Sequence, residues 1–332
     1  MRSSLIQETC MPMTRRRAAA LMGMAPLMAA PSLRAADVFP SKPITLVVGF
    51  GAGGGTDVQA RALAKAASMA LGQSIVIENR PGLSATLGAS QVAQRAAPDG
   101  YSLCMTPATL FRLPHLQKVP FDPLKDFTYI ANITAYTFGI TVPQESPFKS
   151  VKDLVAFGRA NPGKLSYGTT GKGGTSHLMM LRLEKMTGAQ FNMVPFKSST
   201  EIFSAVLGGH VDFSPEAAFG THVNGGKLRS LGIFLADRVP SRPDTPTLRE
   251  QGFDLVAKSS WGIGGPAGMD PKIIQVLQDA FQKASQDSDF KRMLMRDDQP
   301  ALFMDSPTYT RYAHDLYAEE GKYVRELGVK VE

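Results

Sequence analysis

Two glycine-rich loops are the segments of this sequence best suited to binding chemistry. Residues 50–57 read FGAGGGTD, and residues 171–177 read GKGGTSH. Each loop follows a strand-like apolar run and precedes a helical pattern, so the free N–H groups that open the helix can bind an anion. Asp57, in the first turn of its helix, would also stabilise the positive end of the helix dipole. Two such loops in different halves of the chain predict a carboxylate gripped across a cleft.

The first loop also admits a different ligand. Residues 49–54 fit the pattern G-x-G-x-x-G, and Glu78 ends the next predicted strand. This arrangement is typical of dinucleotide-binding enzymes, in which the acid binds a ribose hydroxyl. Glycines and free amides serve phosphate and carboxylate alike, however. An exported NAD(P)-dependent oxidoreductase and a purely structural turn therefore remain alternatives to carboxylate binding.

The second loop carries side chains that suit an anion. Lys172 and the hydroxyls of Thr175 and Ser176 could all bind one, although ordinary helix capping by the same hydroxyls is the alternative. His177 follows one residue inside the predicted helix. We expect this histidine to cap or pack rather than to act in catalysis.

Motifs of catalysis and metal binding are missing from the sequence. It contains no G-x-S-x-G, no H-E-x-x-H and no Cys/His set with metal-ligand spacing. Asp212 and Glu216 are close in sequence, but we interpret them as part of a strand-end turn rather than as an acid–base pair. The expectation is a protein that is not an enzyme, with no catalytic residue, no metal and no cofactor.

The elements that must position the loops alternate between strands and helices. This alternation predicts parallel α/β units, with the loops gathered at one edge of a sheet, where such folds bind ligands. The predicted strands are 44–50, 75–77, 101–105, 138–142, 165–168, 191–194, 211–213, 228–235 and 261–265. The predicted helices are 56–71, 86–97, 150–160, 175–187, 200–207, 271–285 and 307–322.

The N-terminus has the anatomy of a cleavable signal peptide. Arginines at 15–17 precede an apolar stretch at 18–30 and the small residues Ala35 and Ala36. We assign residues 1–36 to a signal peptide with an upstream extension, exported by the twin-arginine route or another.

Residues 1–36 hold five of the 36 basic side chains and one of the 29 acidic ones, which leaves 31 basic and 28 acidic side chains in the rest of the chain. A nearly neutral mature domain without a basic stripe argues against nucleic acid as a partner. Cys104 lies in an apolar run and is predicted to be a buried strand residue.

Ten short motifs recur in order along the mature chain, and together they resemble the Bug receptor family, the periplasmic substrate-binding proteins of tripartite tricarboxylate transporters. The motifs are FPSKPI at 39–44, GGGTD at 53–57, IVIENRPG at 75–82, APDGY at 97–101, FDPLKDF at 121–127, ANPGKLSY at 160–167, SHL at 176–178, VPFK at 194–197, GGHVD at 208–212 and PTLREQG at 246–252.

The resemblance implies an α/β, two-lobed periplasmic binding protein, type II-like, with a ligand cleft between the lobes. Residues 37–137 plus 259–332 would form lobe 1 and residues 138–258 lobe 2, closing by hinge rotation around the ligand. The implied function is capture of a small carboxylate (a di- or tricarboxylate, an acidic amino acid or an aromatic acid) by a periplasmic monomer that meets a membrane permease transiently. A ligand-sensing receptor would use the same site.

The resemblance also implies which residues bind the ligand. Carried over by position, they are Phe50, Gly51, Ala52, Gly53, Gly54 and Asp57 in lobe 1, and Thr169, Gly173, Gly174, Thr175 and Ser176 in lobe 2. The sequence departs from the family at the same place. A proline is usual where Gly51 or its neighbour stands, Ser84 and Thr86 bring hydroxyls to a loop that is usually glycine-rich, and Glu216 replaces an aspartate. We expect Ser84, Thr86 and Glu216 to bind the ligand as well. Phe196 and Ser198 replace a tyrosine and a glycine.

Overall fold

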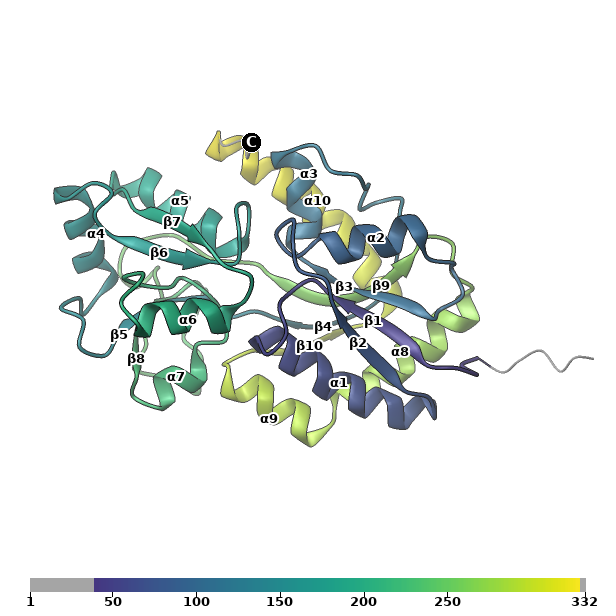
Figure 1. Ribbon diagram of the computed structural model, residues 1–332. Helices are drawn as coiled ribbons and strands as arrows, with labels where there is room; N and C mark the ends of the chain where they lie inside the picture. Colours follow the sequence, from purple (N-terminus) through teal and green to yellow (C-terminus); the bar gives the residue numbers. More distant parts are fainter. Residues whose placement is uncertain (1–38, 329–332) are drawn as a thin grey trace, which may run out of the picture. The chain divides into compact units, whose positions relative to one another are not determined.

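Six strands form one mixed sheet in the computed structural model, which describes residues 39–328. The strands are β1 (Ile44–Val48), β2 (Ile75–Asn79), β3 (Ser102–Pro107), β4 (Phe127–Ala135), β9 (Ser260–Pro266) and β10 (Ala301–Met304). Their order is β10-β4-β9-β3-β1-β2 (Figure 1). β1 pairs in parallel with β2 and β3. β9 runs antiparallel to both β3 and β4, and β10 runs antiparallel to β4.

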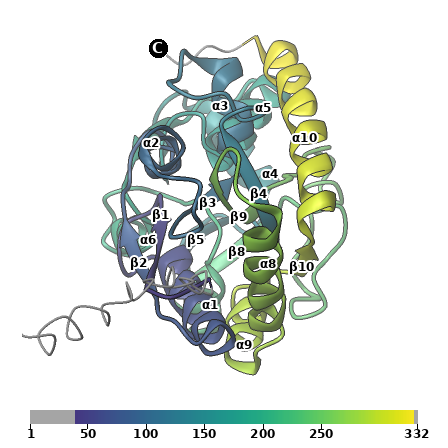
Figure 2. The ribbon, with the colours of Figure 1, turned by 90° about the vertical axis from the view of Figure 1, so that its right-hand side faces the viewer.

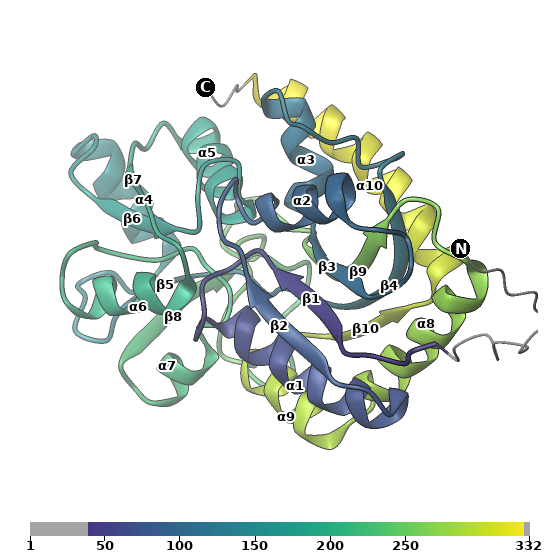
Figure 3. The same cartoon turned by 45° about the vertical axis from the view of Figure 1, so that its right-hand side comes forward.

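Helices cover both faces of this sheet (Figures 2 and 3). One face carries α1 (Gly55–Leu71), α8 (Pro271–Ser285) and α9 (Ser288–Arg296), and the other carries α2 (Leu87–Arg95), α3 (Thr109–Leu116) and α10 (Ser306–Leu327). Side chains alternate along β1, as they must in a strand. Leu46 therefore shares a core with Leu63 of α1 and Phe281 of α8, whereas Val47 shares a second core with Val92 of α2.

The middle of the chain builds two smaller sheets. β5 (Gly139–Pro143) pairs antiparallel with β8 (Leu228–Ile233), and β6 (Ser166–Thr169) pairs in parallel with β7 (Asn192–Pro195). The helices of this region are α4 (Val151–Ala160), α5 (Thr175–Thr187), α6 (Ser199–Leu207) and α7 (Gly220–Asn224). Isolated bridges from Phe213 to Tyr167 and from Ser214 to Thr141 join the two small sheets.

The chain leaves the large sheet and returns to it at neighbouring positions. β4 ends at Ala135, which pairs with Ser260 at the start of β9. One residue further, the Tyr136 N–H donates to the Ser259 carbonyl at 2.8 Å. Because the two crossing segments run in opposite directions, β9 must enter the sheet antiparallel, and the sheet is mixed rather than built of parallel units throughout.

The predicted elements agree with the structure except in a few places. α5 and α8 have the predicted bounds, and the other predicted helices differ by up to five residues at an end. Residues 211–213 were predicted as a strand and are instead a bridged segment between the small sheets. α3, α7, α9, β4 and β10 were not predicted. α3 contains Pro114, a residue that normally argues against a helix interior.

The predictions for the signal peptide and for Cys104 have different outcomes. The signal peptide and upstream extension at 1–36 lie outside the described residues. Cys104 is confirmed as a buried strand residue in β3, where burial raises the pKa of its thiol to about 12. Between residues 39 and 328, no helix has the length and apolar character needed to cross a bilayer.

The first glycine loop is held by the carboxylate of Asp57, which is buried in α1. Its Oδ2 accepts from the Gly53 N–H at 2.9 Å and from Arg61 Nε at 3.0 Å, and its Oδ1 accepts from Asn79 Nδ2 at 2.8 Å. Asn79 also donates to the Phe50 carbonyl at 3.0 Å. Burial alone would raise the pKa of Asp57, but these hydrogen bonds outweigh it and lower the pKa below its ordinary value.

Another loop, at 83–85, approaches the end of β1 very closely. Leu83, Ser84 and Ala85 have φ angles of 48°, 50° and 72°, a left-handed conformation that costs energy in residues with a Cβ. The loop is held by Thr109 Oγ1, which donates to the Ser84 carbonyl at 2.8 Å. A Cβ added at Gly49 would lie 1.9 Å from the Ala85 carbonyl oxygen. Glycine at position 49 is therefore required for this approach.

Gly49→Ala should destabilise the protein for this reason. We expect the free energy of unfolding to fall by at least about 2 kcal/mol, because backbone rather than a flexible side chain must move. Gly51→Ala is the matched control, since its Cβ would meet its nearest neighbours at 3.4 Å, an ordinary contact. Urea unfolding of both variants measures the difference, and equal losses would contradict this account.

Asp57→Asn should reduce stability in a pH-dependent way. The folded pKa of Asp57 is depressed, so its charge stabilises the fold above the unfolded value of 3.8, and that stability is lost as the pH falls through the folded value. We expect a deficit of about 1–3 kcal/mol at neutral pH that narrows below about pH 4. Urea unfolding between about pH 7 and about pH 2 measures it.

The matched control is Asp315→Asn on α10. Asp315 is exposed, and the described part of the chain offers it no hydrogen bond. It should show little deficit at any pH. A deficit for Asp57→Asn that stayed constant down to the lowest pH would show that shape, not charge, holds the loop.

Candidate functional site

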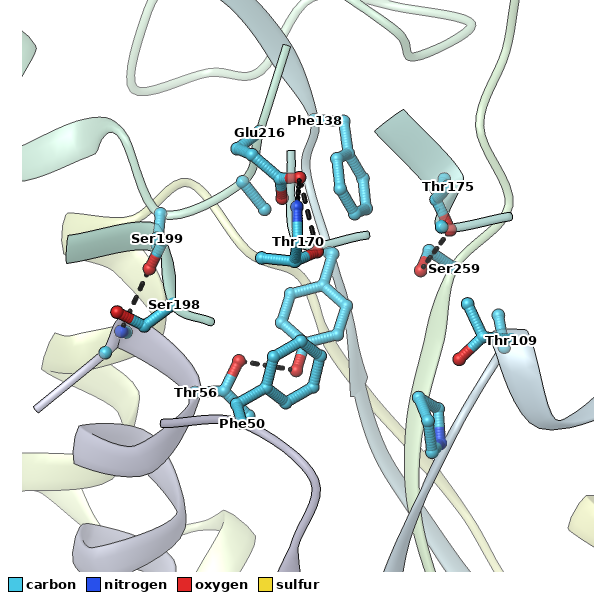
Figure 4. Close-up of a pocket in the computed structure, with 18 of the residues that line it drawn as sticks. Phe50, Thr56, Thr109, Phe138, Thr170, Thr175, Ser198, Ser199, Glu216 and Ser259 are labelled. Carbon is cyan, nitrogen blue, oxygen red and sulfur yellow. Dashed lines mark hydrogen bonds between the residues drawn. The ribbon is translucent and has the colours of Figure 1, made fainter. Parts of the chain in front are cut away.

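A cavity lies where the first glycine loop, the loop at 83–85 and the second glycine loop meet the crossing segments (Figure 4). Its walls leave about 630 Å³ free of protein atoms, a volume that includes open solvent at the mouth of the cavity. The lining residues are Phe50, Gly54, Gly55, Thr56, Ser84, Pro107, Ala108, Thr109, Tyr136, Phe138, Thr170, Gly174, Thr175, Ser198, Ser199, Glu216, Ala217, Ala218 and Ser259.

The structure brings some of the predicted site residues to this cavity and places others behind it. Those that line it are Phe50, Gly54, Ser84, Gly174, Thr175 and Glu216. Those outside the lining are Gly51, Ala52, Gly53, Asp57, Thr86, Thr169, Gly173 and Ser176. Several of the second group support the first. Thr86 Oγ1, for example, donates to the Leu83 carbonyl at 2.7 Å and so holds the loop that carries Ser84.

Three helix N-termini supply the polar part of the cavity wall. α1 begins after Gly54, α5 after Gly174 and α6 after Ser198, and all three capping residues line the cavity. Neither glycine cap offers a side chain to the first amides of its helix. The Gly55 N–H instead donates to Ser199 Oγ at 3.3 Å. Amides and hydroxyls gathered in this way favour an anionic ligand group.

Glu216 brings a buried carboxylate to the same cavity. Its Oε1 accepts from the Thr170 N–H at 2.9 Å, from Ser176 Oγ at 2.5 Å and from Thr169 Oγ1 at 3.1 Å. Burial raises the pKa of Glu216, although these hydrogen bonds act in the opposite direction. The carboxylate of Glu216 thus binds the hydroxyls of Thr169 and Ser176, two residues that we expected to bind the ligand.

Aromatic rings form much of the remaining wall. Phe50, Tyr136 and Phe138 all line the cavity (Figure 4). Tyr136 and Phe138 lie edge to face, with ring centroids 6.0 Å apart. Tyr136 shares a hydrogen bond of 2.9 Å with Thr56 Oγ1, and burial raises the pKa of its phenol far above the ordinary value, so the ring stays neutral.

Positive charge is placed outside the cavity lining. Between residues 39 and 328, no lysine, arginine or histidine lines the cavity. Lys172 and Lys197 line an adjoining cavity that shares Phe50, Ser84 and Thr170 with the first. Behind the second loop, the buried Arg112 binds Glu320 of α10 through two hydrogen bonds of 2.7 Å.

Arg112 also reaches the second glycine loop. Its Nη1 donates to Thr175 Oγ1 at 3.1 Å and to the Gly173 carbonyl at 3.4 Å. Thr175 in turn shares a hydrogen bond of 3.3 Å with Ser259. Arg112 is thus a positioning residue, which ties α3 and the C-terminal helix to a residue of the cavity wall.

The residues available for catalysis have other roles. His177 accepts from the Gly173 N–H at 3.0 Å through Nδ1, in the capping role predicted for it. Burial, with a smaller contribution from Lys172, lowers its pKa to about 4. Asp212 accepts from the Ser166 N–H at 2.7 Å and makes no pair with Glu216. Across residues 39–328, no three His, Cys, Asp or Glu side chains are grouped to hold a metal ion.

The dinucleotide alternative finds little support in the loop geometry. Glu78 accepts hydrogen bonds of 2.6 and 2.9 Å from Arg80. Both of its carboxylate oxygens, one of which would bind a ribose hydroxyl in a dinucleotide site, therefore already have a partner. Within the loop, the Gly53 N–H is taken by Asp57 and the Gly54 N–H by the Gly51 carbonyl.

Sequence reasoning missed a large part of the cavity wall. Thr56, Thr170 and Ser199 each lie next to a predicted residue or motif. For Thr56 and Ser199 the available signal was a hydroxyl at a helix start, whereas Thr170 directly follows β6. Tyr136 and Ser259 come from the crossing segments, 123 residues apart in the chain. Nothing local in the sequence marks that pair.

Comparisons with known proteins agree with the fold and with the family resemblance. The family model "Tripartite tricarboxylate transporter family receptor" matches residues 59–329. A Cupriavidus necator protein named "UPF0065 protein in gbd 5'region" is 41% identical over 313 residues, which are 94% of each chain. The solved structure of the periplasmic binding protein BugD has a TM-score of 0.84 at 27% identity, covering 89% of this chain and 100% of BugD.

Two further solved structures contain ligands. R. palustris Rpa4515 with adipate has a TM-score of 0.82 at 28% identity, covering 88% of this chain and 99% of its own. MatC from Rhodopseudomonas palustris with bound malate has a TM-score of 0.80 at 26% identity, with coverage of 86% and 100%. On the family match and the 41% identical relative, this chain belongs to the tripartite tricarboxylate transporter receptor family of periplasmic solute-binding proteins.

Proposed function

We propose that this protein captures a small carboxylate in the periplasm and presents it, as a monomer, to the membrane permease of a tripartite tricarboxylate-type transporter. The observation that carries the proposal is the convergence of three helix N-termini on one cavity, to which residues 39–328 contribute no cationic side chain. Amides and hydroxyls can hold a carboxylate reversibly without a permanent ion pair. The related structures with adipate and malate support a carboxylate as the ligand.

The ligand carboxylate is best served by the donors at the starts of α1 and α6. Gly55 and Thr56 open α1, and Ser198 and Ser199 begin α6, and all four line the cavity. At α1 and α6 the Gly55 N–H and the Thr56 hydroxyl bond only to neutral groups, Ser199 and Tyr136, which a ligand carboxylate can replace. At the start of α5, by contrast, the hydroxyls of Thr169 and Ser176 are engaged by the carboxylate of Glu216. We therefore assign the carboxylate to α1 and α6, with Phe50, Ser84, Gly174 and Thr175 completing the walls.

Closure of two lobes would enclose the ligand. The proposed lobes are 37–137 plus 259–332 and 138–258, joined at the crossing segments near Tyr136 and Ser259. The glycine loop of the first lobe contacts α6 and its preceding residue in the second. The Gly51 N–H donates to the Lys197 carbonyl at 3.2 Å, and Thr200 Oγ1 donates to the Gly53 carbonyl at 2.9 Å. A ligand held by both lobes favours the closed arrangement.

Calorimetric titration of the purified protein tests the proposal. Succinate, malate, adipate, citrate, glutamate and an aromatic acid form the panel, with NAD(H) as the opposing ligand. At least one carboxylate should bind with measurable heat, and NAD(H) should not. Binding of NAD(H) with no heat from any carboxylate would overturn the proposal.

Ser199→Ala should weaken binding of whichever carboxylate binds best. Loss of one hydroxyl from the wall, and of its hydrogen bond to the Gly55 N–H, should raise the dissociation constant about 5- to 20-fold. Ser204→Ala on the same helix is the matched control, because Ser204 is exposed and outside the cavity lining. It should leave the affinity within about twofold of the parent. Equal effects of the two variants would remove α6 from the site.

A further inference from the structure

The cavity presents a charge problem for a simple carboxylate ligand. Glu216 lies in the wall with 4% of its surface exposed, and no lysine, arginine or histidine among the described residues shares that wall. Two carboxylates confined to one small cavity repel each other, and partial burial strengthens the repulsion because water screens it less. A ligand that binds here must therefore carry a group that compensates the negative charge of Glu216, in addition to its own carboxylate.

Burial raises the pKa of Glu216, but the hydrogen bonds around its carboxylate favour the ionised form. The Thr170 N–H can only donate, and the nearby hydroxyls of Thr169, Thr170 and Ser176 are within reach of the same atom, Oε1. Donors directed at a carboxylate oxygen favour the charged state. Within residues 39–328, none of the hydrogen bonds to this side chain uses Oε2. One oxygen of a nearly buried carboxylate is thus left without a protein donor.

The aromatic rings of the same wall suit a positive group. Phe50, Tyr136 and Phe138 line the cavity with Glu216 (Figure 4). Aromatic faces attract ammonium groups, and a carboxylate beside them adds an ion pair. Lys172 and Lys197 line the adjoining cavity and make no ion pair within the described part of the chain.

We propose that Glu216 determines ligand specificity by binding a protonated amino group, so that the ligand is an amino-carboxylate rather than a simple carboxylic acid. This inference rests on the proposed function, since it keeps the ligand carboxylate at the N-termini of α1 and α6. The ammonium group would fill the space between Oε2 of Glu216 and the aromatic wall. The ligand would then carry a carboxylate for the N-termini of α1 and α6 and an ammonium group for Glu216.

Matched pairs of compounds test this inference by calorimetry at neutral pH. Glutamate is compared with glutarate, aspartate with succinate, and 4-aminobutanoate with butanoate. In at least one pair the amino compound should bind at least about tenfold more tightly, and Glu216→Gln should reduce that preference to less than about threefold. The glutamine keeps an acceptor for the Thr170 N–H, so the variant should fold, which thermal unfolding checks.

Asp212→Asn is the matched control, because Asp212 is an exposed acid outside the cavity lining. It should keep the full preference for the amino compound. If at least one carboxylate binds but no amino compound binds more tightly than its partner, the inference is overturned while the proposed function stays intact. An amino preference that survives in Glu216→Gln would overturn it too. If no member of any pair binds and no other carboxylate does, the proposed function fails first.

Discussion

Backbone N–H groups at the start of a helix need acceptors, and this constraint organises the whole cavity wall. At α1, the loop amide of Gly53 is taken by Asp57. At α5, the loop amide of Gly173 is taken by His177. At α6, the N–H of Lys197, which precedes the helix, is taken by Glu201 Oε2 at 3.1 Å. Each loop is thus fixed by a side chain from its own helix, and the remaining donors are left for a ligand.

Two charged side chains hold the second glycine loop from different sides. Glu216 accepts from Thr170 and Ser176, and Arg112 donates to Gly173 and Thr175. Both charges are nearly buried, so each is costly unless its partners are in place. The geometry of this loop therefore depends on elements as distant in sequence as α3, α10 and the turn that follows the bridged segment at 211–214.

The sequence was informative where structure is local. The glycine loops, the helices that follow them and the buried position of Cys104 could all be predicted, because each depends on neighbouring residues. The antiparallel entry of β9 could not, because it follows from the pairing of Ala135 with Ser260 across a long intervening segment. β4 lacked a clear pattern because seven of its nine residues are buried, so polar and apolar positions do not alternate.

The same division applies to the site. Glycines and hydroxyls at helix starts are visible in the sequence, and six of the fourteen residues predicted from them line the cavity. Asp57 was assigned to ligand binding, yet its carboxylate is used inside the loop. The aromatic wall depends on Tyr136 and Phe138 of a crossing segment, which no local motif marks. Glu216 could be selected from sequence, but the engagement of its Oε1 by Thr169, Thr170 and Ser176 depends on tertiary contacts.

The hydrogen bonds of Asp57 have a consequence for the speed of capture. Because Gly53, Arg61 and Asn79 already hold the carboxylate, the first glycine loop has its shape before a solute arrives. Ordering a loop during association costs entropy and slows productive encounters. A receptor with a preformed loop avoids that cost, so ordering of this loop does not slow the trapping of a solute. Such a protein can respond to brief rises in solute concentration outside the cell membrane.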